Sequence, residues 1–109
     1  RDQARASQIE TLKENVNNPR STQETINKAQ DMIYNLSNII AMEAHGENLL
    51  RSKGYEDAAI FIEGEIISVL VKKEQITEED VIRIGDLVVR ATGYSLEQVV
   101  ITPIETEDY

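Results

Sequence analysis

The spacing of apolar residues changes near Gly54, and this change constrains the fold more than any other feature of the sequence. Before Gly54, apolar residues recur every three or four positions, as on one face of an α-helix. After it, residues 58–62 and 66–71 are short runs rich in β-branched and aromatic residues, separated by Glu63-Gly64-Glu65. Such runs around a glycine-containing turn predict a β-hairpin. The chain is therefore expected to combine long helices with a small sheet.

Two helical segments are predicted before Gly54. The first, Asp2 to Val16, has a thin apolar stripe and ends at Asn17-Asn18-Pro19, because the residue before proline disfavours helix. The second begins at Ser21, which forms a capping box with Glu24, and ends at Lys53. Gly54 is placed to stop it. A glycine inside this segment, Gly46, costs about 1 kcal/mol relative to alanine, so one kinked helix and two shorter pieces both fit.

A third helix and a last strand are predicted after the hairpin. Thr77 caps the helix, and the acidic residues 78–80 occupy a first turn where the helix dipole favours negative charge. Its expected buried stripe comprises Val81, Ile84, Leu87, Val88 and Ala91, and Thr92-Gly93-Tyr94 ends it. Residues 99–104 predict the strand, in which Pro103 suits a sheet edge.

These elements predict an α+β fold, with two helices on one face of a three-stranded sheet in an α-β-β-α-β order. We expect residues 1–19 to be a helical arm or stalk and residues 20–109 to be the domain. The first strand is placed between the other two, and the crossover to the last strand is right-handed. Residues 105–109 are expected to be a frayed acidic end.

Composition excludes several classes of partner. The net charge of −9 disfavours nucleic acid and anionic lipid, because binding to nucleic acid depends on neutralising phosphates. The chain has no cysteine, and no apolar run approaches the roughly 20 residues that span a bilayer. Because the chain starts at Arg1 without methionine, we expect that a targeting or membrane segment has been removed.

Residues that could carry chemistry are few. His45 lies between Glu43 and Glu47, but a single imidazole is a weak signal for a metal or a general base, and we expect it to face solvent. The acidic pairs Glu56-Asp57 and Glu63 with Glu65 are expected to be solvated. No nucleophile motif or phosphate loop is present. We therefore predict no catalytic site, no metal and no cofactor.

The strands predict an interaction surface. Side chains alternate along a strand, so Ile66, Ser68 and Leu70 share the face that the helices leave uncovered, and Phe61 is expected to join them. A monomer has little reason to expose such an apolar patch, although a tail folding over it would be a simple alternative. A second candidate is an unpaired strand edge formed by Val99, Val100, Ile101 and Thr102.

Several short stretches occur in an order typical of one protein family: Gly54-Tyr55-Glu56-Asp57-Ala58, Glu63-Gly64 and Val69-Leu70-Val71-Lys72. The helix ending in Arg51-Ser52-Lys53, the helix over 81–91 and the strand around Val99-Val100-Ile101 fit the same layout. In this respect the chain resembles the stage III sporulation protein AH family of endospore-forming bacteria. The resemblance covers roughly residues 20–105 and is sharpest over 54–72, whereas residues 1–19 carry none that can be specified.

The resemblance implies a protein of the mother-cell membrane around the forespore, anchored by one helix, with this domain between the two membranes. There the family is thought to bind stage II sporulation protein Q, forming a channel or zipper needed for engulfment. Its fold resembles the ring-building domains of type III secretion and flagellar ring proteins, which implies that copies could form a homo-oligomeric ring. The alternative from another class is a small-ligand-binding regulatory α/β module, since architecture alone does not fix function.

Overall fold

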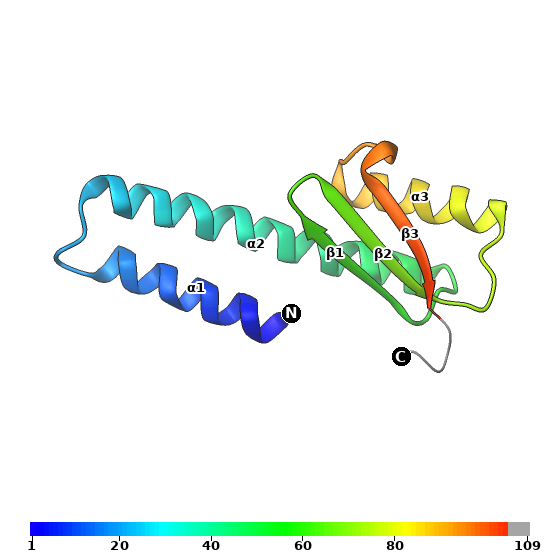
Figure 1. Ribbon diagram of the computed structural model, residues 1–109, viewed down its shortest axis with the longest axis horizontal. Helices are drawn as coiled ribbons and strands as arrows, with labels where there is room; N and C mark the ends of the chain where they lie inside the picture. The colour runs from blue at the N-terminus through cyan, green and yellow to red at the C-terminus, as the bar shows by residue number, and fades with distance from the viewer. Residues whose placement is uncertain (105–109) are drawn as a thin grey trace. The chain divides into compact units, whose positions relative to one another are not determined.

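The computed structural model describes residues 1–104, so the expected frayed end at 105–109 lies outside the described residues. Figure 1 shows the elements in chain order. They are α1 (Asp2–Asn17), α2 (Gln23–Ser52), β1 (Ala58–Glu63), β2 (Ile66–Lys72), α3 (Glu78–Thr92), the short 3₁₀-helix η1 (Leu96–Gln98) and β3 (Val99–Ile104). This order confirms the predicted α+β architecture with a helical N-terminal arm.

The chain divides into two compact units, residues 1–40 and a second unit that begins at Ala41. The first consists of α1 and the first part of α2, joined by a turn near Pro19 (Figure 1). Leu12 and Ala29, one from each helix, are its buried apolar side chains. Within residues 1–104, no helix has both the length and the apolar character needed to cross a membrane.

The second unit contains the sheet, whose strand order is β1-β2-β3. β1 pairs with β2 in the antiparallel sense and β3 pairs with β2 in the parallel sense. The prediction that β1 lies at the centre is therefore wrong, and β2 holds that position. The reason is that the outer edge of β1 is covered by side chains of α2, so the strand that follows α3 can join the sheet only at β2.

One face of the sheet packs against residues 41–52 of α2 and against α3, and this layer forms the core. Alternate strand residues are buried on this face, as expected for side chains of period two. The core side chains include Ile60, Ile62, Ile67, Val69 and Val71 from the strands, and Leu50, Ile84 and Val88 from the helices. The prediction that Val81 belongs to this stripe is wrong, because its side chain is 45% exposed.

The helix ends agree with the predicted capping signals, except at the start of α2. Thr77 caps α3 in a reciprocal capping box with Asp80, and Gly93 ends this helix in the left-handed region at φ 77°. The start of α2 is capped one residue later than predicted, because the hydroxyl of Thr22, not Ser21, accepts the N–H of Thr25. α2 is one continuous helix through Gly46. A Cβ at Gly46 would lie 2.5 Å from Cδ1 of Ile60, so the missing side chain lets α2 approach β1.

Candidate interaction surfaces

The sheet face turned away from the helices, here called the outward face, brings together most of the predicted binding residues. Across the strands, Phe61 lies opposite Ser68, Ser68 opposite Val100, and Leu70 opposite Thr102. Directly opposed residues point to the same side of a sheet, so these side chains share the outward face with Ile66. Phe61, Ser68 and Leu70 are half-buried, whereas Ile66 is 50% exposed.

The outward face is hollowed at one end. Phe61, Glu63, Ile66 and Ser68 line a shallow pocket of about 430 Å³. Aromatic and aliphatic side chains are typical of the apolar centre of a protein interface, and polar groups such as Glu63 are typical of its rim. The structure thus places three of the predicted residues around one depression.

The predicted edge residues 99–102 divide between the two faces of the sheet. Val100 and Thr102 belong to the outward face, with Val100 48% exposed. Val99 and Ile101 lie opposite Ile67 and Val69, so they point to the helix side, where they are half-buried. These four residues therefore do not form a single patch.

The outer edge of β1 is covered. The N–H groups of Ile60 and Ile62 each donate a 2.8 Å hydrogen bond to a carboxylate of α2, that of Glu47 and that of Glu43 respectively. Both glutamates are buried, and they lie four residues apart on one side of the helix. Edge N–H groups that would otherwise attract a foreign strand are thereby occupied.

The sequence presents Glu43 and Glu47 only as neighbours of His45. In the structure they are buried against β1, whereas His45 is exposed on α2. Their role could have been predicted from their i, i+4 spacing next to Gly46 and Leu50. This spacing places both carboxylates on the side of the helix that packs against the core. A carboxylate at such a position must find hydrogen-bond donors.

Within residues 1–104, no strand pairs with the outer edge of β3. The N–H of Lys73 donates to the carbonyl of Ile104. This bond shows that the main-chain groups of Ile104 point toward β2. Main-chain N–H and C=O groups alternate in direction along a strand. Those of Val100 and Thr102 therefore also point toward β2, whereas the main-chain groups of Val99, Ile101 and Pro103 point away from β2, to the free side of the edge. Pro103 has no N–H to offer, which agrees with its prediction as an edge residue.

An apolar groove lies between α3 and this open edge. Its volume is about 540 Å³, and its lining residues are Val81, Ile82, Gly85, Asp86, Val89, Leu96, Val99 and Ile101. Ile82 is 73% exposed and Leu96 is 61% exposed. This surface was missed in the sequence, although the adjacent pair Val81-Ile82 makes the apolar side of α3 broader than one contact with a sheet needs.

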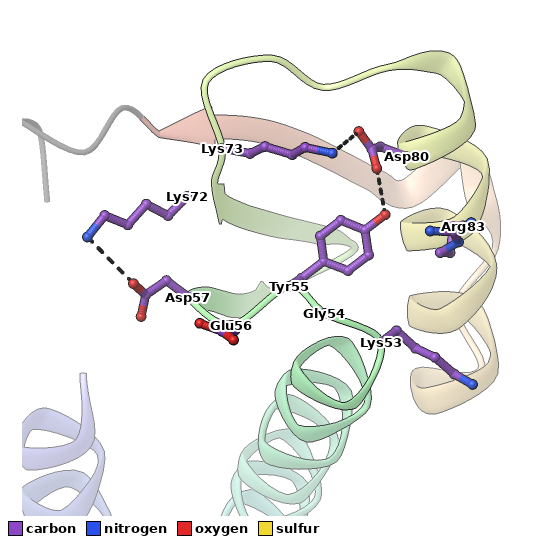
Figure 2. A pocket seen from close by; sticks show the side chains of 9 residues that line it. All are labelled: Lys53, Gly54, Tyr55, Glu56, Asp57, Lys72, Lys73, Asp80 and Arg83. Atoms are coloured by element: carbon purple, nitrogen blue, oxygen red, sulfur yellow. Dashed lines mark hydrogen bonds and ion pairs between the residues drawn. The ribbon is translucent and has the colours of Figure 1, made fainter.

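A polar pocket of about 370 Å³ lies at the N-terminal end of α3, next to the connection between α2 and β1 (Figure 2). Inside it the hydroxyl of Tyr55 donates to Asp80 over 2.7 Å, and Nζ of Lys73 donates to the same carboxylate over 2.7 Å. Hydrogen bonds from Lys73, from the Thr77 backbone and from Tyr55 hold the pKa of Asp80 far below its usual value. Burial and the bond to Asp80 raise the pKa of Tyr55.

The remaining acidic candidates lie at the surface. Glu56, Glu63 and Glu65 are exposed, and Asp57 forms a 3.5 Å ion pair with Lys72 (Figure 2). Across residues 1–104, no three histidine, cysteine, aspartate or glutamate side chains are grouped so that they could hold a metal ion.

The fold and these surfaces define a small two-layer α+β domain with one covered and one open sheet edge, preceded by a helical arm. A family model described as SpoIIIAH-like protein matches residues 1–101, and the chain belongs to this family. The match includes residues 1–19, where no single motif indicates the family.

Two relatives show how far the similarity extends. Stage III sporulation protein AH of Bacillus subtilis (strain 168) is 30% identical over 89 residues, which are 82% of this chain and 41% of that protein. The chain therefore spans less than half the length of this curated relative. A chain in the solved structure of the SpoIIQ–SpoIIIAH pore forming complex has a TM-score of 0.85 and 27% identity, covering 96% of this chain and 90% of that one.

Proposed function

We propose that this chain is a structural, non-enzymatic component of a sporulation complex that binds stage II sporulation protein Q, or SpoIIQ. The observation that carries this proposal is the match at a TM-score of 0.85, over 96% of the chain, to a protein in the SpoIIQ–SpoIIIAH pore forming complex. Membership of the SpoIIIAH-like family, which the sequence itself shows, supports it independently.

The outward face supplies a surface for such a partner. Ile66 and Val100 expose apolar side chains there, and Phe61 borders the shallow pocket. A stable pair of proteins buries roughly 1,200–2,000 Å² in total, with an apolar centre and a polar rim. Glu63 and Glu65 at the hairpin turn provide acidic groups for that rim, which would favour a partner with basic groups opposite.

The location of the protein follows from the same proposal. The whole protein would be anchored in the mother-cell membrane by one helix, with this domain in the space between the mother-cell and forespore membranes. Residues 1–19 would lead toward the anchor, and residues 20–109 would carry the binding surfaces. Several copies arranged side by side would form the ring or channel.

Isothermal titration calorimetry of this domain against the extracytoplasmic domain of SpoIIQ from the same organism tests the proposal. We expect a complex with one copy of each protein. Phe61→Glu and Ile66→Glu should weaken it, because a charge in an apolar interface loses its hydration. Tyr34→Glu, at an exposed residue of α2 in the first unit, is the matched control. Circular dichroism confirms that each variant is folded.

The outcomes separate two levels of the proposal. No heat of binding, together with no complex in size-exclusion chromatography, would reject SpoIIQ as the partner. Binding that both glutamate variants leave unchanged would reject only the outward face as the binding surface.

The alternative of a small-ligand-binding module has one specific observation in its favour, the polar pocket beside Tyr55. A thermal-shift screen with common metabolites tests it, because a ligand at 100 times its dissociation constant adds about 2.7 kcal/mol of stability. A rise in Tm that Tyr55→Phe abolishes would favour this alternative.

A further inference from the structure

We propose that Gln98 is a positioning residue for partner binding. It fixes the turn between β1 and β2, and through this turn it fixes the shape of the shallow pocket on the outward face. The inference rests on the proposed function, in which SpoIIQ binds this face. It deepens that function by naming a residue outside the pocket lining that prepares the surface before the partner arrives.

The turn between β1 and β2 consists of two residues, Gly64 and Glu65, because Glu63 and Ile66 are the last paired residues of the two strands. Gly64 has a φ of 59°, and no residue other than glycine has a positive φ within residues 1–104. These values agree with a type II′ turn, which has glycine at its first central position. The carbonyls of such a loop lie beyond the strand ladder, so the strands supply no donor for them.

Both carbonyls of the turn accept hydrogen bonds from side chains of the segment that precedes β3. Nε2 of Gln98 donates to the carbonyl of Glu65 over 2.9 Å, although the two residues lie 33 positions apart. The hydroxyl of Tyr94 donates to the carbonyl of Gly64 over 3.5 Å. The bond from Gln98 is the shorter of the two, so we assign the main positioning role to this residue.

The side chain of Gln98 is itself held in place. Its Oε1 accepts hydrogen bonds from the N–H and from the hydroxyl of Ser95, over 3.0 and 3.1 Å. The N–H of Gln98 donates to the carbonyl of Ser95 over 3.0 Å. Both ends of the Gln98 amide are therefore bonded, and its nitrogen is directed at the turn.

The pocket begins where the turn ends. Glu63 and Ile66 flank the turn as a cross-strand pair, and both line the pocket together with Phe61 and Ser68. Ile66 is 50% exposed, so its place depends more on the backbone of the turn than on packing around the side chain. A turn that is already fixed loses less conformational entropy when the partner binds, and binding is tighter as a result.

Three variants separate the bond to the turn from the other bonds of Gln98. Gln98→Glu still offers an acceptor to Ser95 but cannot donate to the carbonyl of Glu65. Gln98→Met loses both interactions without adding a charge. Ser95→Ala is the matched control, because it removes one hydroxyl and leaves the donor to Glu65 in place.

Isothermal titration calorimetry against the SpoIIQ extracytoplasmic domain measures the effect on binding. Both Gln98 variants should bind at least roughly fivefold more weakly than the parent chain, because the partner must then order the turn. Ser95→Ala should bind like the parent chain. Circular dichroism confirms that each variant is folded.

Two further measurements distinguish positioning from a general structural role. NMR order parameters of residues 63–66 in the free domain should fall in both Gln98 variants and stay unchanged in Ser95→Ala. In a double-mutant cycle, Gln98→Met should weaken binding little further once Ile66→Glu is present, because Gln98 acts through the pocket that Ile66 lines.

Weaker binding of both Gln98 variants, with lower order parameters and coupling to Ile66, would support the inference. Binding like the parent chain in either Gln98 variant, unchanged order parameters, an equal loss in Ser95→Ala or additive losses with Ile66→Glu would each overturn it and leave the proposed function standing. Absence of any complex with the parent chain would overturn the proposed function, and the inference would fall with it.

Discussion

The hydroxyl of Tyr55 donates a 2.7 Å hydrogen bond to Oδ1 of Asp80, 25 residues further along the chain. Oδ2 of the same carboxylate accepts from Nζ of Lys73 and from both the N–H and the hydroxyl of Thr77. One buried carboxylate thus joins the connection before β1, the end of β2 and the first turn of α3 (Figure 2).

This network predicts how stability depends on pH in acid. The pKa of Asp80 is lowered in the folded state, chiefly by the hydrogen bond from Lys73, so the unfolded chain binds a proton at higher pH than the folded one. The resulting stability is complete above the unfolded pKa of about 3.9 and is lost as pH falls through the folded pKa. Urea titrations at several pH values should show this loss. In the Asp80→Asn variant, the free energy of unfolding should depend less on pH in the acid range, which is called the acid limb below.

A suitable control is Asp86→Asn, which removes an exposed carboxylate from the same helix. It should leave the acid limb almost unchanged. Equal effects of the two variants would contradict the special role of Asp80.

Removing only the hydroxyl of Tyr55 should have a smaller effect. Tyr55→Phe deletes one hydrogen bond but leaves the other bonds of Asp80 in place, so the free energy of unfolding should fall by about 1 kcal/mol at neutral pH. The raised pKa of Tyr55 contributes stability below pH of about 10, which is lost as pH rises through the folded pKa. The variant should therefore lose part of the alkaline limb as well, and an unchanged alkaline limb would argue against this contribution.

The two glutamates that cover β1 should matter for folding. Glu43→Ala leaves the buried N–H of Ile62 without this acceptor, so the free energy of unfolding should fall by about 1–3 kcal/mol. Urea denaturation measures the change, and His45→Ala, at an exposed position two residues away, is the control. If the two variants unfold at the same urea concentration, the hydrogen bond contributes little.

Gly46 should not tolerate a larger side chain. The Cβ of alanine would lie 2.5 Å from Cδ1 of Ile60, and such overpacking costs about 1–3 kcal/mol. Better helix propensity returns up to about 1 kcal/mol, so we expect Gly46→Ala to be less stable by about 0.5–2 kcal/mol. Ile60→Val in the same background removes the clashing methyl group. It should recover part of the loss, and failure to do so would mean that the contact is not the cause.

Substitutions at Gly93 test how much the backbone conformation at the end of α3 contributes to stability. Its φ of 77° is left-handed, and no heavy atom lies within 4 Å of where a Cβ would be. Gly93→Ala should therefore cost about 1–2 kcal/mol, which thermal unfolding would report as a lower Tm. Asparagine tolerates this conformation better, so Gly93→Asn should be milder. Equal losses for the two variants would point to a cause other than the backbone.

The features that the sequence predicted correctly depend on neighbours along the chain. Thr77 needs only Asp80 three residues later, Gly93 needs only the preceding helix, and the bounds of β3 follow from a short run of β-branched residues. These signals are local, so they survive without knowledge of the tertiary structure.

The features that were missed depend on contacts between distant segments. The central place of β2 is decided by what covers β1, and the glutamates that do so lie 13 and 19 residues before their partners. Similarly, the prediction that Val81 is a core residue fails because periodicity cannot reveal where a three-stranded sheet stops. Periodicity identifies an apolar side of a helix, but only the sheet's width decides how much of it is covered.

The carboxylates of Glu43 and Glu47 also limit how this sheet can grow. A sheet with two open edges can add strands on both sides and extend without end, as in a fibril. Because the β1 side is closed, strands can be added only at β3, and two copies of the domain joined edge to edge at β3 would leave no open edge among the described strands. The domain therefore cannot extend by itself into a continuous sheet, which protects it against edge-to-edge aggregation.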